Sequence, residues 1–516
     1  MRCLAAAGEG FLAVVGGICL LPLCCLKLVY TLHVSPEDNT RVLTHNGLSF
    51  AFAMLAVAGV LLLVYPIFRR FSERTIFLLG LSLYLIVGIH WVLHASTWRG
   101  GDPAMILNYV QKILQDVDYS GLAPDHYLGF YPYQMGFLNY ERLLWSLVPE
   151  IRFLFAVNLA WVLLIQLLLW RVSTALFPSR PMVRKYGILC SFCFLPPFLL
   201  MLFLYGTVPG TGSAILSWLF AILASVTAKA YRRRLYLCGT ILAMAAAVWL
   251  KPDELIAAIA LTICLVLMWL SDIRKRWDLL AAGCILIVCC FALQPVQAAY
   301  YRHKTGYPVE GIPMAAEIAT GLQEHPASPY RAGRYNGYEY DIYELSGYDS
   351  TATASLARAN IQERLAWFKA HPKEALDFFT RKLLATWCVP TFESVVTGPS
   401  EANGAVSSSP LMQSLYEGDW AFFFYERLMN GYVFLLYLLA LIGCVRFLSG
   451  KSQDMTGRPG RAFILFPVIC LTGGFLYHLV GETKALCAFM YVIMLLPFAA
   501  ESAEALAGKL WRTLRR

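Results

Sequence analysis

Charged side chains are scarce in this sequence. Asp, Glu, Lys and Arg make up 15% of its 516 residues, hydrophobic residues make up 58%, and the mean hydropathy is +0.58. A water-soluble enzyme needs a larger share of charged residues to cover its surface, so the composition excludes that class. The chain also has no separate basic domain, and its net charge of +9 therefore gives no indication of a nucleic-acid partner.

Several familiar signals are missing as well. No disulfide framework is indicated, because nearly all of the 15 cysteines lie inside apolar runs and Cys388 alone lies in a long polar region. Cys190 and Cys193 have CxxC spacing, but their apolar surroundings favour small packing residues over metal ligands. The region 297–424 lacks a Gly-rich phosphate loop, an HExxH motif and a GxSxG motif, so nothing there predicts a nucleotide, zinc-protease or serine-hydrolase site.

Long apolar runs are abundant instead. About 20 apolar residues are needed to cross a membrane as a helix, and the runs predict an all-α polytopic membrane protein with about twelve transmembrane helices. Phe11–Leu32 is long and lacks a clear small-residue cleavage site, which predicts a retained first span rather than a signal peptide. The expected spans are 8–32, 48–68, 76–95, 153–177, 187–205, 211–229, 235–250, 255–271, 278–296, 429–448, 462–480 and 485–503.

The Lys and Arg residues gather in every second loop. Positive residues stay on the cytoplasmic side of short loops, so this pattern predicts a multi-pass protein of the cell membrane with cytoplasmic N- and C-termini. The same bias explains the positive net charge. The residues are Arg69, Arg70, Arg74, Arg180, Arg184, Lys185, Lys229, Arg232, Arg233, Arg234, Arg274, Lys275, Arg276, Lys451, Arg458, Arg461, Lys509, Arg512, Arg515 and Arg516.

The two long loops lie on the predicted outer side and carry the soluble mass. Residues 1–95 hold three spans, 96–151 form the first long outer loop, and 152–296 hold spans four to nine. An outer helical lobe is expected at 297–424, and the last three spans at 425–516. Within the lobe, helices are expected near 314–323, 350–370 and 375–387, and Ser400–Pro410 is typical of a flexible lid or linker.

Asp102 is the candidate catalytic residue in the first outer loop. It lies a few residues after the third span, so its carboxylate should sit at the membrane face, where partial desolvation suits a general base. Gly100-Gly101-Asp102-Pro103 is also typical of a helix start, with Asp102 as N-cap and Pro103 at the first helical position. The two roles are compatible.

The rest of that loop predicts two amphipathic surface helices, 104–117 and 135–147, joined by an aromatic turn at 127–134. Aromatic rings at this level form membrane belts, and they also stack on sugars in carbohydrate enzymes; both interpretations stay open. The candidate substrate-contacting residues of the loop are Asp118, Asp125, Tyr131 and Tyr133.

Four ionisable residues near membrane level are candidates for binding a lipid phosphate. Lys251, in the loop between spans seven and eight, could meet a phosphate at headgroup height or pair with Asp253 or Glu254. His478, Glu482 and Lys484 follow a Gly-Gly interruption in the polar turn 473–484, and such groups are costly to keep in lipid. A purely structural pair between Glu482 and Lys484 is the alternative.

Taken together, these features resemble the GT-C class of integral membrane glycosyltransferases, with the protein O-mannosyltransferase and aminoarabinose transferase branch, and bacterial proteins like them, as the nearest families. The resemblance extends from about Leu78 to the end of the chain. It implies a polyprenyl-phosphate sugar as donor and Asp102 as the catalytic base. The family usually places this acid after the first span, often as an Asp-Glu pair, whereas Asp102 follows the third. The matching segments are Gly101-Asp102, Tyr131-Pro132, Lys251-Pro252, 382–390 and 473–484.

The expected function is transfer of a sugar from a polyprenyl-phosphate donor to an acceptor hydroxyl on the extracytoplasmic face. The acceptor would be a glycan, lipid or protein, and the other partner is the membrane lipid itself. No cofactor is predicted from the residues, no metal ligands are identified, and a divalent metal requirement stays open. Two alternatives remain: a transporter or lipid flippase, although no paired broken helices or matching halves are seen, and a lipid-linked glycan polymerase or ligase.

Overall fold

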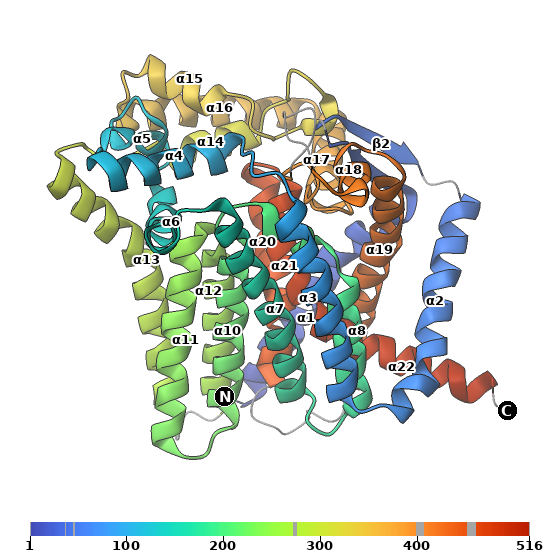
Figure 1. Cartoon of the computed structure of the whole chain (residues 1–516). Coiled ribbons are helices and arrows are strands. Elements are labelled where there is room, and N and C mark those ends of the chain that lie inside the picture. Colours follow the sequence, from blue (N-terminus) through green and yellow to red (C-terminus); the bar gives the residue numbers. More distant parts are fainter. Residues whose placement is uncertain are drawn as a thin grey trace.

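A computed structural model describes most of the chain, and it shows long helices packed into a bundle with shorter helices gathered at one end (Figure 1). We call this end the lobe side. We call the opposite end the basic side, because Arg69, Arg70 and Arg232 lie at that end. Helix α1 begins and helix α22 ends on the basic side. The described residues are 2–36, 38–44, 47–271, 276–398, 407–450 and 461–514.

Some predicted features fall outside the described residues. They are residues 400–406 of the proposed lid and the basic residues Arg274, Lys275, Lys451, Arg458, Arg515 and Arg516.

Nine helices of the described chain are long and apolar enough to cross a membrane. This confirms a multi-pass, helical membrane protein, because each of the nine coincides with a run that the sequence assigned to a span. They are α1 (Arg2–Val29), α2 (Gly47–Arg70), α3 (Glu73–His94), α7 (Ile151–Leu176), α10 (Thr207–Val226), α11 (Ala230–Leu250), α12 (Leu255–Ser271), α13 (Trp277–Thr305) and α19 (Trp420–Leu448).

The remaining three predicted spans are not single long helices. The span expected at 187–205 is α8 (Pro181–Cys193) followed, after a 44° bend, by α9 (Pro196–Leu199) and the 3-10 helix η3 (Leu200–Leu202). The span expected at 485–503 is α21 (Ala485–Met494) and α22 (Leu496–Leu514), bent by 56°. Proline near the start of each second piece explains the breaks, since it cannot continue a helical hydrogen-bond ladder. The eleventh, α20 (Phe466–Val480), is a shorter apolar helix.

Two predicted boundaries are wrong by about nine residues. Helix α13 continues to Thr305, nine residues beyond the expected end, and α19 begins at Trp420, nine residues before the expected start. Aromatic residues at these lobe-side ends, such as Tyr300 and Trp420, prolong the helices out of the purely apolar runs. The expected division of the chain at 424 therefore falls inside a helix.

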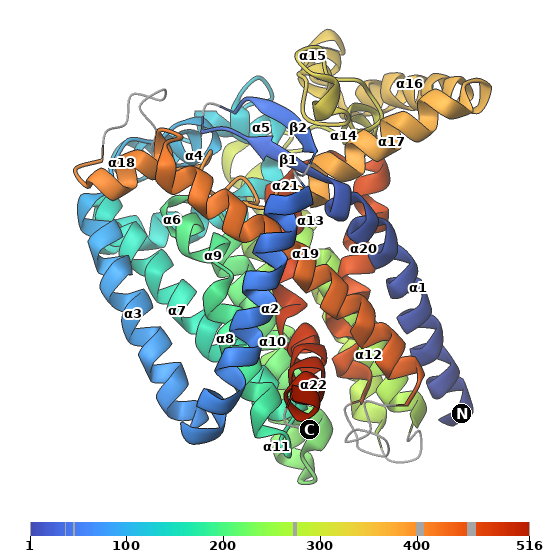
Figure 2. The same ribbon diagram turned by 90° about the vertical axis from the view of Figure 1, so that its right-hand side faces the viewer.

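A two-stranded hairpin follows α1 and was not predicted. Strands β1 (Tyr30–Val34) and β2 (Thr40–Thr44) pair antiparallel, with Tyr30 opposite Thr44. Figure 2 shows the hairpin on the lobe side, above the end of α1. Leu32 and Val34 pack against Ala385, and the Leu32 amide donates a hydrogen bond to the Cys388 carbonyl oxygen at 3.2 Å. The first span therefore ends at Val29, before the predicted residue 32.

The surface helices expected on the lobe side are present (Figure 1). The first group contains α4 and α6, which pack against each other, and the second group contains α14, α16 and α17 at the predicted positions. The bounds are α4 (Gly101–Asp116), η1 (Ser120–Leu122), α5 (Tyr127–Phe130), η2 (Pro132–Gln134), α6 (Met135–Leu147), α14 (Met314–Gly321), η5 (Pro329–Arg331), α15 (Tyr338–Leu345), α16 (Ser350–Ala370), α17 (Pro372–Trp387) and α18 (Pro410–Tyr416).

Candidate functional site

Segments far apart in the sequence line a cavity of about 300 Å³ on the lobe side. We call it the Asp102 cavity. Its charged lining consists of three carboxylates and three cations, and Leu202 and Phe203 give it an apolar wall. The structure thus brings Asp102 and Lys484 to one cavity, although 381 positions separate them in the chain. The lining residues are Asp38, Trp98, Arg99, Gly100, Gly101, Asp102, Pro103, Leu202, Phe203, Arg334, Glu393, Val396, Thr397, Gly398 and Lys484.

Asp102 lies in the first turn of α4 but does not cap it. Gly100 is the N-cap residue and has no side chain to donate or accept, and Gly101 makes the entry turn with a φ of +57°, a value that glycine adopts readily. Within the described chain, the Asp102 carboxylate accepts no backbone hydrogen bond from α4. The expected N-cap role is therefore wrong, and the half-buried carboxylate stays available to a ligand in the cavity.

Tyr127 lies beside Asp102 and can orient it. Burial raises the pKa of the Tyr127 hydroxyl, and the nearby Tyr205 and Asp102 raise it further. A hydroxyl that keeps its proton can donate to the carboxylate. Gln134 holds Tyr127 in turn, because its Nε2 amide donates to the Tyr127 hydroxyl oxygen at 3.4 Å and also to that of Tyr205.

The three cations of the cavity differ in what they contact. Arg334 is neutralised, with its guanidinium 3.1 Å from an Asp38 carboxylate oxygen and 3.5 Å from Glu393. Arg99 lies 4.1 Å from the centre of the Phe155 ring, and its buried Nε and Nη2 atoms have no hydrogen-bond partner among the described residues. The Lys484 ammonium likewise makes no hydrogen bond or ion pair within the described chain. The charge of Arg99 interacts with the buried Glu141 carboxyl group, and the charge of Lys484 interacts with Glu482. Arg99 and Lys484 are still the cations of the cavity with N–H groups left to donate to an anion.

Glu482 forms no direct ion pair with Lys484 among the described residues, although the Lys484 charge acts on its carboxyl group. Its carboxylate accepts a hydrogen bond from the Tyr335 backbone amide at 3.3 Å instead. The turn that carries both residues is held by Lys382, whose fully buried ammonium donates to the carbonyl oxygens of Gly481, at 2.8 Å, and Gly321. Lys382 therefore fixes the position from which Lys484 reaches the cavity.

Lys251 and His478 lie close to this region but do not line the Asp102 cavity. The Lys251 ammonium forms an ion pair with Asp253 at 2.8 Å and lies 5.0 Å from the centre of the Tyr205 ring. His478 is buried, and its Nδ1 atom lies 2.9 Å from the Glu482 carbonyl oxygen, to which it donates. Lys251 is thus engaged by a carboxylate, whereas the buried Nε2 atom of His478 has no hydrogen-bond partner among the described residues. The expected role of both residues in phosphate binding stays a prediction.

The candidate residues of the first loop separate into two groups. The Asp118 carboxylate accepts hydrogen bonds from the Ser120 amide, at 2.8 Å, and hydroxyl, at 3.0 Å, and it forms a turn. Asp125 pairs with His126 at 2.8 Å and is exposed. Neither aspartate lines the Asp102 cavity, and their expected contact with a substrate stays a prediction.

Tyr131 and Tyr133 instead lie near a cluster of acidic residues that the sequence did not reveal. The Tyr131 hydroxyl donates to the Glu339 carboxylate at 3.0 Å, and the Tyr131 and Tyr133 rings are in edge contact. Burial raises the pKa of Glu339 to about 8, and the neighbouring charges of Glu482 and Glu317 add to the rise. Burial also raises the pKa of Glu317 to about 7, helped by Glu482.

The stability of the protein is expected to fall as the pH rises through this acidic cluster. A carboxyl group whose folded pKa lies above its unfolded value of 4.5 stabilises the fold while protonated, and this contribution is lost as the pH approaches 7 to 8. Glu339→Gln keeps a hydrogen-bond acceptor for Tyr131 but cannot ionise, so the Tm should fall less between pH 5 and pH 9 than in the parent chain. Thermal unfolding across that range measures the difference, and parallel curves for the two proteins would contradict the assignment.

The residues present do not favour a metal centre. Among the described residues, no group of three or more His, Cys, Asp and Glu side chains is arranged to hold a metal ion.

No family model, curated protein or solved structure matches this chain. The fold and the cavity define a polytopic helical membrane protein with a charged cavity on one face.

Proposed function

We propose that the protein is a membrane glycosyltransferase, which moves a sugar from a polyprenyl-phosphate donor to a hydroxyl group of a glycan, lipid or protein acceptor. The observation that carries the proposal is the Asp102 cavity itself. It combines the Asp102 carboxylate, which can act as a base, with two cations, Arg99 and Lys484, that have N–H groups left to bind a phosphate, and it adjoins the apolar helix bundle.

The proposed reaction is a displacement at C1 of the sugar. Asp102 takes the proton of the acceptor hydroxyl as its oxygen forms a bond to C1. The bond between C1 and the phosphate oxygen breaks, and its electron pair leaves with the polyprenyl phosphate. The Lys484 ammonium and the Arg99 guanidinium offset the negative charge that develops on this leaving group, an effect that is strong where water is excluded.

The cavity also fits a lipid-linked donor better than a nucleotide sugar. A polyprenyl phosphate is anchored by its tail in the bilayer, so the protein needs only a phosphate site and a sugar site at membrane level. Leu202 and Phe203 supply an apolar wall directly beside Lys484 and Arg99. Purified protein should therefore transfer radiolabelled sugar from at least one member of a panel of polyprenyl-phosphate donors without an ion gradient, whereas a transporter would transfer none.

Lys484→Gln is expected to lower kcat/KM for the donor by about tenfold to a hundredfold, since hydrogen bonds to charged groups are worth about 1.5–3 kcal/mol. The KM of the acceptor should not change, because the ammonium contacts only the phosphate in this scheme. Lys112→Gln is the matched control: Lys112 is exposed on α4 and does not line the cavity. Equal donor kinetics for Lys484→Gln and the parent protein would remove Lys484 from the site.

The proposed orientation puts the lobe side outside the cell and both termini in the cytoplasm, because the basic loops gather at the opposite end. A cysteine introduced at Asp125, which is exposed on the lobe side, should react with a membrane-impermeant thiol reagent in intact cells. A cysteine at Arg232, on the basic side, should react only after the membrane is opened. The parent chain gives the background from its own cysteines, and the reverse labelling pattern would place Asp102 on the cytoplasmic face.

A further inference from the structure

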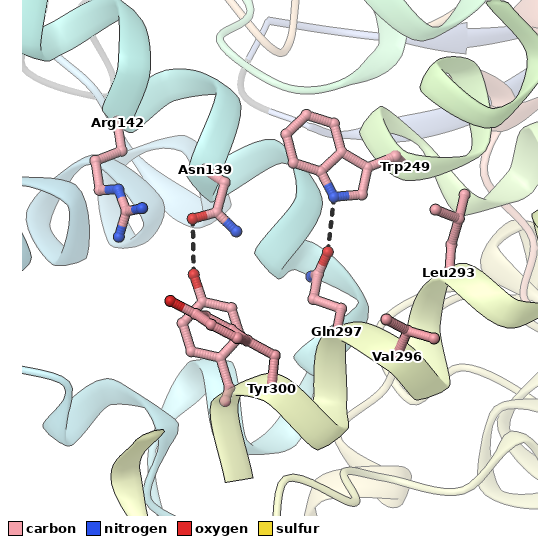
Figure 3. Close-up of a pocket in the computed structure, with 8 residues that line it drawn as sticks. Asn139, Arg142, Trp249, Leu293, Val296, Gln297 and Tyr300 are labelled. Atoms are coloured by element: carbon pink, nitrogen blue, oxygen red, sulfur yellow. Dashed lines mark hydrogen bonds between the residues drawn. The ribbon is translucent and has the colours of Figure 1, made fainter. Parts of the chain in front are cut away.

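A second cavity, of about 330 Å³, lies between α6 and the lobe-side end of α13 (Figure 3). It shares no lining residue with the Asp102 cavity. Its walls come from α6, α11 and α13, and the close-up shows the α6 side chains facing those of α13. The lining residues are Asn139, Arg142, Trp249, Leu293, Val296, Gln297, Tyr300 and Tyr301.

Two internal hydrogen bonds fix the polar groups of this second cavity. The Tyr301 hydroxyl donates to the Asn139 Oδ1 atom at 2.7 Å, and the Trp249 indole N–H donates to the Gln297 Oε1 atom at 2.7 Å (Figure 3). The second bond orients the Gln297 amide and leaves its Nε2 group as a donor. Within the described chain, neither that Nε2 group nor the Arg142 guanidinium has a hydrogen bond or an ion pair.

The charge of the second cavity is positive without compensation. Arg142 is its one charged lining residue, and no Asp or Glu takes part in the lining. Arg302 and Lys304, in the last turn of α13, add positive charge nearby. A fork-shaped guanidinium together with an amide donor suits a phosphate group. A zwitterionic headgroup would find no carboxylate for its ammonium here.

An apolar surface runs along α13 below the second cavity. Ile285, Val288, Phe291 and Val296 are exposed at roughly helical spacing on a helix that is long and apolar enough to cross a membrane. Leu293 and Val296 line the second cavity and extend this apolar surface into it. A ligand for this site therefore needs an anionic group near Arg142 and a hydrocarbon chain along α13.

We propose that the second cavity binds the headgroup phosphate of an anionic glycerophospholipid, whose acyl chains lie against the exposed face of α13. This site goes beyond the proposed sugar transfer, since none of its residues lines the Asp102 cavity. Bound lipid would fasten α6, and through it α4, to α13. The lipid is thus a structural ligand of the lobe side.

The test is lipid binding to the purified full-length protein in a zwitterionic detergent. Phosphatidylglycerol should raise the Tm and remain bound in native mass spectra, whereas phosphatidylethanolamine should do neither at the same concentration. Arg142→Gln should weaken phosphatidylglycerol binding by about tenfold or more, as expected for a lost charged hydrogen bond. Arg152→Gln, on the lobe-side end of α7 and paired with Glu150 at 3.7 Å, should bind as the parent does.

A second variant separates the lipid from a simple anion. Val296→Trp places a large side chain in the second cavity at an exposed lining position and keeps Arg142. This variant should therefore also lose phosphatidylglycerol binding. Unchanged binding by Arg142→Gln would overturn the site, and so would unchanged binding by Val296→Trp. Full competition by millimolar inorganic phosphate would show that a free anion suffices and would overturn the assignment to a lipid.

Discussion

Replacing Asp102 by Asn is expected to lower sugar transfer by roughly two to four orders of magnitude, the usual contribution of a general base. The Asn side chain has nearly the same size but cannot accept the proton of the acceptor hydroxyl. The fold should survive, because Asp102 is half-buried at a cavity wall and caps no helix. Initial rates with a radiolabelled polyprenyl-phosphate donor, measured at equal amounts of folded protein, give the ratio.

Asp125→Asn is the matched control for this substitution. Asp125 belongs to the same loop region, is exposed and pairs with His126, and it lies outside the Asp102 cavity. Its replacement should leave transfer unchanged. A folded Asp102→Asn protein with full activity would rule out Asp102 as the base. The other carboxylates of the cavity, Asp38 and Glu393, are already paired with Arg334, so the mechanism itself would then fail.

Asp102 and Lys484 could be found from the sequence because each signal is local. An ionisable residue a few positions from a long apolar run must lie near membrane level, whatever the rest of the fold does. Arg334, Glu393 and Asp38 carry no such signal, since they belong to polar segments of ordinary composition. Only the packing of the hairpin and the second lobe group beside α4 brings these three residues to the same cavity.

The acidic cluster of Glu317 and Glu339 could not be predicted from the sequence, for a related reason. Glu317 and Glu339 lie on short amphipathic helices, where a carboxylate normally faces water. Their raised pKa values come from burial under neighbouring segments, which a local pattern cannot reveal. Tyr131 was singled out for its aromatic ring, whereas its observed contact is the hydrogen bond from its hydroxyl to Glu339.

The same limit applies to the fold: features set by neighbouring residues could be predicted from the sequence, whereas features set by distant residues could not. Apolar length identified the membrane segments, but it could not show that β1 continues directly from α1, because Thr31, Leu32 and Val34 prolong the apolar run of the helix. The turn-forming residues Ser35 and Pro36 were the available signal for a hairpin. Likewise, Pro497 was the signal that the last span bends after Met494.

An ionic network on the basic side holds α22, the second piece of the last span, against neighbouring helices. Glu501, which is 4% exposed, accepts hydrogen bonds from Arg180 at 2.7 Å and from Arg446 at 3.0 and 2.8 Å. Arg180 also contacts Glu504 at 2.8 Å. These bonds connect α22 to α19 and to the start of α8, so one carboxylate compensates two partly buried guanidinium groups.

Glu501→Ala is therefore expected to destabilise the protein by roughly 2 to 4 kcal/mol, because it leaves the partly buried Arg446 guanidinium without its carboxylate and removes one of the two carboxylates that Arg180 contacts. The estimate stays below the largest values for such losses, since each arginine side chain keeps about a fifth of its surface exposed. Thermal unfolding of the purified protein should show a lower Tm. Glu504→Ala, which removes only the outer bond to Arg180, should lower the Tm by a clearly smaller amount.

Glu501→Ala and Asp102→Asn lie at opposite ends of the helix bundle, and one should affect stability while the other affects activity. The Glu501→Ala protein that remains folded should keep the parent kcat, because α22 contributes no residue to the Asp102 cavity. Asp102→Asn should do the reverse, with an unchanged Tm and little transfer. Equal Tm values for Glu501→Ala, Glu504→Ala and the parent would show that the network does not hold α22 in place.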